Sequence, residues 1–73
     1  MSIGSCILKE SEARGWSVKE LARRAHCKVA DLNAVILGER PLRAEVGAKI
    51  DKALGTSEGF WMQLQGYLRR STG

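Results

Sequence analysis

Cationic side chains dominate the chemistry that this sequence could perform, and many of them gather near the middle of the chain. Twelve Lys and Arg residues stand against eight Asp and Glu residues, which gives a formal net charge of +4. A group of these cations lies within or beside the segment 18–37: Lys19, Arg23, Arg24, Lys28, Arg40 and Arg43. Such a cluster predicts attraction to the phosphates of a nucleic acid. The alternative interpretation is a basic surface that binds no ligand.

Nucleophilic and metal-binding side chains are sparse. The one histidine, His26, stands next to Cys27, and Cys6 is the other cysteine. Neighbouring side chains in a turn point in different directions, and the sequence has no Cys-x-x-Cys or paired-histidine spacing. A Cys–His nucleophilic pair would also need a third group to orient the base. We therefore expect no catalytic centre, no metal and no cofactor, and no small-molecule ligand is evident.

The length of 73 residues predicts one domain over residues 1–73. A domain of this size buries only about 60% of its unfolded surface, so a partner subunit is the expected source of further stability. No apolar run approaches the ~18 residues of a membrane span, and the first Lys or Arg is Lys9, unlike a secretory signal. Two cysteines are too few for a disulfide framework. We expect a reduced, cytoplasmic protein without membrane contact.

Helices must position these side chains, because the sequence lacks the alternating β-branched runs that predict strands. Start and stop signals predict five helices. The first is expected over about 5–14, with an apolar stripe that Ser11 interrupts. The second is expected over about 18–25, opened by a capping box between Ser17 and Glu20.

The last three helices follow from similar signals. The third is expected over about 29–37 and ends at Gly38, and the fourth over about 44–54. Ser57 is expected to cap the fifth helix, and residues 71–73 to form a loose tail. Apolar residues at helical spacing are expected to face the core: Leu32, Val35, Ile36, Val46, Ile50 and Leu54.

The segment from about 18 to 37 has the residue types that a helix-turn-helix needs. Leu21 and Ala22 would pack under the second helix, and Cys27 would fill the corner between the helices. His26 occupies the turn, where positive φ is usual and histidine is among the enriched residues. Such a crossing lets the second helix lie in the major groove of DNA. An ordinary helical hairpin is the alternative, but it does not explain the nearby cations.

The expected DNA contacts follow from this placement. Val29 and Ala30 offer only apolar contact, for instance to a thymine methyl group, whereas Asn33 could read an adenine or be merely solvated. Arg40 and Arg43 are placed to clamp the sugar-phosphate backbone, while Arg23 and Arg24 could equally be solvated. The full set of expected contacts is Ser17, Lys19, Lys28, Val29, Ala30, Asn33, Ala34, Arg40 and Arg43.

Over residues 15–65 the chain resembles the Cro/C1-type (XRE) helix-turn-helix proteins, and in particular the HigA-like antitoxins of bacterial toxin–antitoxin modules. The resemblance rests on Gly15-Trp16-Ser17, Glu20-Leu21-Ala22-Arg23-Arg24, Leu32, Gly38-Glu39-Arg40-Pro41-Leu42, Ala53-Leu54-Gly55-Thr56-Ser57 and Phe60-Trp61-Met62-Gln63-Leu64-Gln65. It implies an all-α, compact, five-helix lambda-repressor-like domain that forms a homodimer and binds a palindromic double-stranded DNA operator. It also implies repression of its own operon and neutralisation of a RelE/HigB-like ribonuclease toxin.

The chain departs from the family pattern at four positions. Val18 stands where Gln is common, and Lys28 and Arg43 stand where Ser or Thr usually caps a helix. Each lost cap costs roughly 1 kcal/mol, while the added positive charge strengthens phosphate attraction. Gly47 replaces a usual Ala, at a cost of about 1 kcal/mol in helix propensity, and would allow close helix packing.

Two further surfaces are expected to meet protein partners. A dimer contact is expected at Phe60, Leu64, Tyr67 and Leu68 of the fifth helix. Because few residues follow that helix, a toxin is expected to contact the mixed-charge face of the first helix, at Lys9, Glu10, Glu12 and Arg14. Two other functions stay open: a stand-alone phage, plasmid or restriction–modification controller-type regulator, and a protein-binding adaptor whose helix-turn-helix no longer binds DNA.

Overall fold

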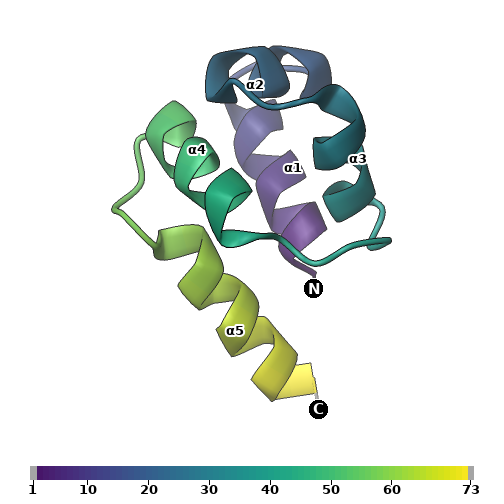
Figure 1. The fold of residues 1–73 in the computed structure, drawn as a ribbon, viewed down its shortest axis with the longest axis vertical. Helices are drawn as coiled ribbons and strands as arrows, with labels where there is room; N and C mark the ends of the chain where they lie inside the picture. Colours follow the sequence, from purple (N-terminus) through teal and green to yellow (C-terminus); the bar gives the residue numbers. More distant parts are fainter. Residues whose placement is uncertain (1, 73) are drawn as a thin grey trace.

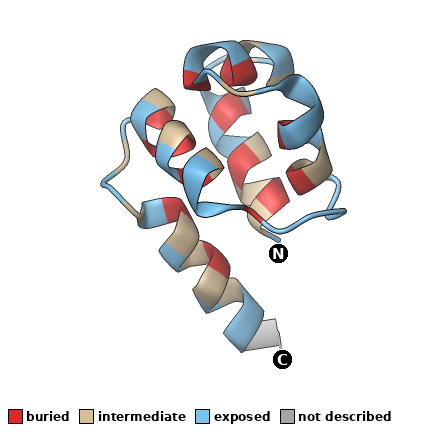
Figure 2. Cartoon of the chain, viewed as in Figure 1, coloured by how far each residue is buried: buried red, intermediate tan, exposed pale blue. Residues whose placement is uncertain are grey.

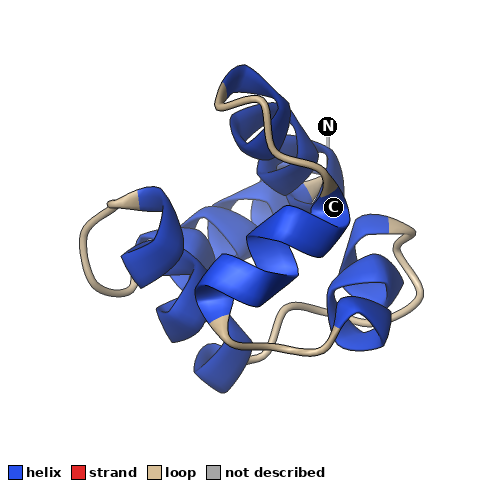
Figure 3. Ribbon diagram, turned by 90° about the horizontal axis from the view of Figure 1, so that it is seen from above, coloured by secondary structure: helices blue, strands red, loops and turns tan. Residues whose placement is uncertain are grey.

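The computed structural model describes residues 2–72, which form five α-helices: α1 (Ile3–Ala13), α2 (Val18–Ala25), α3 (Val29–Ile36), α4 (Ala44–Leu54) and α5 (Phe60–Thr72). In Figure 1, α1 lies between α3 and α4, α2 lies across one end, and α5 extends away at the other. The view from above in Figure 3 shows these helices joined by loops. Residues 2–72 contain no strand, and none of their helices has the length and apolarity to cross a membrane. The expected all-α, five-helix architecture is confirmed.

Each helix contributes one large apolar side chain to the centre of the core. These side chains are at most 1% exposed: Ile7, Leu21, Leu32, Ile50 and Trp61. Figure 2 shows the buried faces of the helices turned toward one another, with exposed residues on the outside. Burial of each such side chain stabilises the fold by about 1.5–3 kcal/mol. Because every helix contributes one of them, the five helices share one core.

The start of α1 differs from the sequence-based expectation. The helix begins at Ile3, two residues before the expected Ser5. Ser2 is the N-cap: its Oγ accepts a hydrogen bond from Ser5 N at 3.1 Å, and Ser5 Oγ accepts one from Ser2 N at 3.2 Å. A second serine thus takes the place of the Glu or Gln of the usual capping box. Without that signal, the sequence placed the helix start too late.

Ser11 does not interrupt the inner face of α1. Its side chain is buried, and its Oγ donates a hydrogen bond to the carbonyl oxygen of Trp16 at 2.8 Å. The hydroxyl therefore satisfies a polar group in the chain that follows the helix, and burying it carries no unpaired donor. The expectation of a broken stripe was wrong because a small polar residue can belong to the core when it is hydrogen-bonded.

Asp51 organises the start of α5, a role expected for Ser57. Its carboxylate accepts hydrogen bonds from Thr56 Oγ1 at 2.8 Å, Gly59 N at 2.9 Å and Trp61 N at 3.3 Å. Because α5 begins at Phe60, Ser57 stands three residues before the helix and not at its N-cap. The cap thus comes from the preceding helix. At the other end, α5 continues through Thr72, into the segment 71–73 for which the sequence predicts a loose tail; Gly73 lies outside the described residues.

Gly4 lets α1 lie directly against the end of α3. A Cβ at this buried position would stand 2.6 Å from the carbonyl oxygen of Ile36 and 2.7 Å from that of Val35. Both neighbours are backbone atoms, which cannot move aside as a flexible side chain can. We expect Gly4→Ala to lower the free energy of unfolding by about 1–3 kcal/mol, the usual cost of overpacking a core.

Urea unfolding followed by circular dichroism would measure this loss. Gly66→Ala in α5 is the matched control, because a Cβ there meets nothing closer than Arg70 Nη1 at 3.6 Å. The control should gain up to about 1 kcal/mol from helix propensity alone. Equal unfolding midpoints for Gly4→Ala and the wild type would contradict the close contact between α1 and α3.

Candidate nucleic-acid interface

The turn between α2 and α3 has the geometry expected from the sequence. His26 ends α2 in the left-handed conformation, with φ 57° and ψ 42°. The backbone N–H of Cys27 donates to the carbonyl of Ala22 at 3.0 Å, and α3 begins two residues later at Val29. The side chain of Cys27 packs against the core, as do Leu21 and Leu32 of the two helices. The helix-turn-helix is therefore held from inside, and its outer side is free to contact a ligand.

The outer face of α3 is nearly free of charge. Leu32 and Val35 point into the core, so helical spacing places Ala30, Asn33 and Leu37 on the opposite side. Of the expected contacts, Val29, Ala30 and Asn33 are exposed and Ala34 is half-buried. Leu37 was missed by the sequence analysis, although 70% of it is exposed, more than any other large apolar residue described. Leu37 lies seven residues, or about two helical turns, after Ala30, and this spacing is the signal that would have found it.

Positive charge lies around this face and not on it. Lys28 and Arg43 occupy the N-cap positions of α3 and α4, and neither makes a side-chain capping hydrogen bond, as the sequence led us to expect. They line one surface hollow of about 340 Å³, although they are far apart in sequence. Arg43 also borders a smaller hollow together with Arg40 and Asp31. The structure therefore brings three of the expected phosphate contacts to one side of α3.

Ser17 and Lys19 lie at the start of α2. Ser17 Oγ accepts a hydrogen bond from Glu20 N at 3.1 Å, and Val18 and Lys19 are the first two residues of the helix. The exposed side chains of Ser17 and Lys19 leave this helix start open to solvent. A helix start of this kind, with a lysine beside it, has the polarity to meet a phosphate.

Comparison with protein-family models gives a match to the helix-turn-helix family over residues 8–61, which is most of the chain. The chain belongs to the Cro/C1-type (XRE) helix-turn-helix family. Searches of curated proteins and of solved structures found no match. The protein is therefore a DNA-binding transcription regulator, and domains of this family are not typically enzymes. Its exposed α3 occupies the place of a recognition helix.

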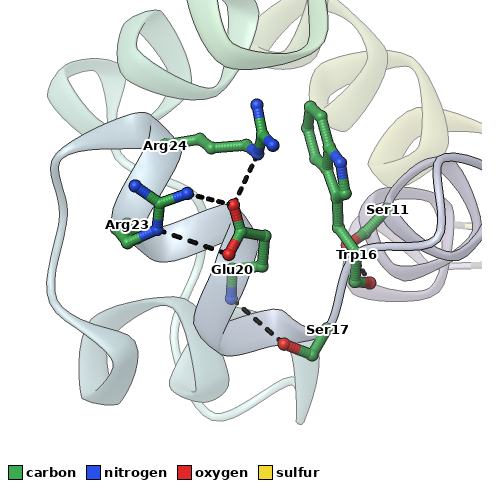
Figure 4. Close-up of polar contacts among 6 residues, drawn as sticks. All are labelled: Ser11, Trp16, Ser17, Glu20, Arg23 and Arg24. Carbon is green, nitrogen blue, oxygen red and sulfur yellow. Dashed lines mark hydrogen bonds and ion pairs between the residues drawn. The ribbon is translucent and has the colours of Figure 1, made fainter.

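The capping box expected at the start of α2 forms only in part. Ser17 caps the helix, but the carboxylate of Glu20 turns away and accepts hydrogen bonds from Arg23 Nη2 and from Arg24 Nε, the latter at 2.7 Å (Figure 4). The hydrogen bond from Arg23 lowers the pKa of Glu20. Arg24 also stacks over Trp16, with its guanidinium carbon 4.3 Å from the ring centroid. The expectation was wrong because two nearby guanidinium groups compete for the same carboxylate.

This network separates two kinds of cation in the helix-turn-helix protein. Arg23 and Arg24 form ion pairs with Glu20. Within residues 2–72, ion pairs of that kind are absent for the remaining cations of the central cluster, which are Lys19, Lys28, Arg40 and Arg43. The carboxylate of Glu20 compensates the first kind. The second kind forms no such pair and is available to an external anion, although Asp31 and Glu45 line the hollow that Lys28 and Arg43 share. The unpaired cations are also the ones that the sequence analysis assigned to DNA.

Gln65 of α5 fastens the loop 37–43, which carries Arg40. Gln65 is buried, and its Nε2 donates to the carbonyl oxygen of Leu42 at 2.9 Å, while Leu42 N donates to Gln65 Oε1 at 2.6 Å. Leu42 itself is buried between the exposed Arg40 and Arg43. Sequence reasoning missed this contact, which fixes the backbone from which both arginines extend.

We expect Gln65→Leu to weaken DNA binding by loosening this loop. The substitution leaves the N–H and the carbonyl of Leu42 without partners and lowers the free energy of unfolding by about 1–3 kcal/mol. Gln63→Leu is the matched control, because Gln63 lies on the same helix and is exposed. Thermal unfolding and DNA titration at a temperature where both variants are folded would be compared. If the two variants bind DNA equally well, Gln65 does not position the loop.

Replacement of Lys28 by serine is expected to raise stability and to weaken DNA binding. We expect Lys28→Ser to raise the free energy of unfolding by about 1 kcal/mol, because serine can accept a hydrogen bond at the N-cap. The same change should flatten the salt dependence of DNA binding by about one unit of slope, because one phosphate contact is lost. Thermal unfolding and DNA titrations over a range of salt would test both effects. Unchanged salt dependence would remove Lys28 from the interface.

The residues expected to meet protein partners lie on α5 and at α1. On α5, Phe60 and Tyr67 are 39% and 59% exposed, and Leu64 and Leu68 are half-buried. On α1, Lys9, Glu10 and Glu12 are exposed. Arg14 has a role within the fold, since its Nη2 donates to the carbonyl of Leu54 at the end of α4 and its Nη1 pairs with Glu10, each at 2.9 Å.

The cysteines do not form a metal site in the described structure. No group of three His, Cys, Asp or Glu side chains within residues 2–72 is placed to hold a metal ion. Cys6 and Cys27 are free and half-buried. Burial raises the pKa of the Cys27 thiol, so near neutral pH it stays protonated and packs as a small apolar side chain.

Proposed function

We propose that the protein is a dimeric antitoxin and autorepressor. It binds a palindromic operator to repress its own operon, and it neutralises a small RelE/HigB-like ribonuclease toxin. The observation that carries the DNA-binding part is the exposed outer face of α3 with the unpaired Lys28, Arg40 and Arg43 around it. The antitoxin part rests on the resemblance of residues 15–65 to HigA-like proteins.

The apolar face of α5 supports a two-fold dimer. Phe60 and Leu64 form a ridge between two surface hollows, one of about 350 Å³ that reaches Cys6 of α1 and one of about 580 Å³ that includes Tyr67. In a two-fold contact, the ridge of each copy can enter a hollow of the other. Two recognition helices would then lie about 34–36 Å apart and meet half-sites one DNA turn apart.

Sedimentation at micromolar concentration would test this assembly. The wild type is expected to be a dimer, and Tyr67→Ala should shift it toward a monomer that binds a palindrome less tightly. Lys52→Ala is the control, because Lys52 is exposed on α4 and lines neither hollow. A wild type that is monomeric and binds its operator as a monomer would overturn the dimer.

The outer face of α1 is the proposed toxin contact. Its alternating charges at Lys9, Glu10 and Glu12 suit a polar, basic partner. Because Glu10 holds Arg14 against the end of α4, reversal of its charge would disturb the fold. Charge reversal at Glu12, which is exposed and lines neither hollow of the dimer contact, is the sharper test and should weaken the toxin complex while DNA binding is kept.

Co-expression with the product of the neighbouring gene would test the antitoxin role. We expect that product to inhibit growth when it is expressed alone, and to co-purify with this protein. If it does neither, a stand-alone regulator of a phage, plasmid or restriction–modification system takes the place of the antitoxin. The presence of the α3 face and the α5 ridge on one small domain favours this second candidate, since operator binding needs nothing more.

A further inference from the structure

The surface that would face the base edges is made almost entirely of hydrocarbon. Ala30, Asn33 and Leu37 lie opposite the buried side of α3, and Val29 and Ala34 extend this face to either side. Four of these five side chains are apolar, and Asn33 is the only one that can form a hydrogen bond. The face can therefore form few hydrogen bonds with the donors and acceptors of the bases. It can instead pack against methyl groups and follow the shape of the groove.

The sizes of these side chains fit a close approach to the groove floor. Ala30 and Ala34 are small and stand one helical turn apart in α3, between Val29 and Leu37, where they let its backbone come near the bases. The larger Val29 and Leu37 stand at the two ends of the helix, 38% and 70% exposed. Apolar surface of this kind gains free energy when another apolar group covers it. In the major groove, the exposed apolar group of a base pair is the C5-methyl of thymine.

The outer face of α3 lacks the usual means of reading guanine. Guanine is most often read by an Arg or Lys that binds O6 and N7 together. No Arg or Lys lies on the outer face of α3, since Lys28 precedes the helix and Arg40 and Arg43 follow it. Asp31, which could accept from a cytosine amino group, lines the two hollows that also contain Arg43. The cations are therefore placed for phosphates, and Asp31 lies among them.

We infer that α3 selects its DNA through thymine methyl groups, with Asn33 reading an adenine among them, so that the contacted half-site is a run of A·T pairs. This inference rests on the proposed function only in that the protein must bind duplex DNA through α3. It goes beyond it by naming the chemical group that gives specificity. It also adds Leu37 to the contact residues that the sequence predicts.

Deoxyuridine in place of thymine is the direct test, because it removes one methyl group and keeps every hydrogen-bonding group of the base pair. A half-site would first be selected from random duplex DNA with the full chain, and each thymine would then be replaced singly. We expect each contacted methyl group to account for about a fourfold change in Kd, the factor that corresponds to burying one methyl-sized group. Replacement of thymines that flank the site should have no effect.

A double-mutant cycle would tie the methyl groups to the protein. In Val29→Ala or Leu37→Ala, at least one thymine that mattered for the wild type should lose its deoxyuridine effect. Both residues are exposed, and circular dichroism would confirm that each variant is folded. If both variants bind DNA more weakly but every deoxyuridine effect stays as in the wild type, the assignment to these side chains is wrong.

Failure of this inference can be distinguished from failure of the proposed function. If the protein binds duplex DNA with steep salt dependence but deoxyuridine changes nothing, or the selected half-site consists of G·C pairs, the inference is wrong and DNA binding stands. If the protein binds no duplex at any salt concentration, the proposed function itself fails.

Discussion

Replacement of Asp51 by alanine is expected to lower the free energy of unfolding by about 3 kcal/mol. Its carboxylate is the acceptor for Thr56 Oγ1, Gly59 N and Trp61 N, and the residue is only 3% exposed. Each donor left buried without a partner costs about 1–3 kcal/mol, and part of that cost is relieved when the loop moves into water. A small domain has about 5–15 kcal/mol of stability in total, so the loss is a large fraction of it.

Thermal unfolding would show this as a fall in Tm of roughly 10–20 °C. Lys52→Ala is the matched control, because Lys52 is the next residue on the same helix and is exposed. Asp51→Asn should fall between the two, since an amide oxygen can still accept one or two of the bonds. A Tm for Asp51→Ala within a few degrees of the control would show that the carboxylate does not hold α5.

Removal of both Arg40 and Arg43 is expected to cause the largest loss of DNA affinity. Each phosphate contact releases a counterion, so the double alanine variant should lose about two units from the slope of log K against log salt. At moderate salt this corresponds to a loss on the order of tenfold in affinity for each arginine. The loss should be nearly the same for every DNA sequence, because phosphates carry no sequence information.

Two further variants make this test specific. Arg23→Ala is the matched control, because Arg23 is already paired with Glu20, and the slope should change little. Asn33→Ala should leave the slope unchanged and relax preference at one base position, at a cost of about 1–3 kcal/mol there. A double arginine variant that binds an operator normally at every salt concentration would place the DNA face elsewhere on the molecule.

Much of the fold could be predicted because its signals are local. Gly15, Gly38 and Gly55 adopt positive φ where the sequence predicts that a helix ends, and His26 does so in the expected turn. Most of the apolar residues expected in the core, among them Leu32 and Ile50, are buried there. These features depend on a few neighbouring residues, so their spacing alone carries the information.

Sequence-based predictions are wrong where one side chain has several partners within reach. Glu20 could complete a capping box or pair with arginines, and the sequence does not rank these choices. Asp51 bonds to the start of a helix ten residues later, and Gln65 reaches back to Leu42 across 23 residues. Such contacts depend on how helices pack, which helical spacing does not specify.

The candidate site shows the same division between features that local spacing predicts and contacts that depend on packing. The periodicity of α3 was sufficient to predict that Val29, Ala30 and Asn33 are exposed. Leu37 escaped notice because leucine is usually a core residue, although its spacing of seven residues from Ala30 places it on the exposed side of α3. The pairing of Arg23 and Arg24 with Glu20 is likewise visible only in the structure, and it decides which cations stay available for DNA.

The central claim is that duplex DNA meets the outer face of α3 and the cations around it. Amide chemical-shift mapping by NMR during titration with duplex DNA tests this claim most directly, residue by residue. We predict the largest shifts at the start of α2, along α3 and in the loop 37–43, with small shifts on the outer face of α1. Shifts concentrated on α1 or α5, with α3 unchanged, would contradict it.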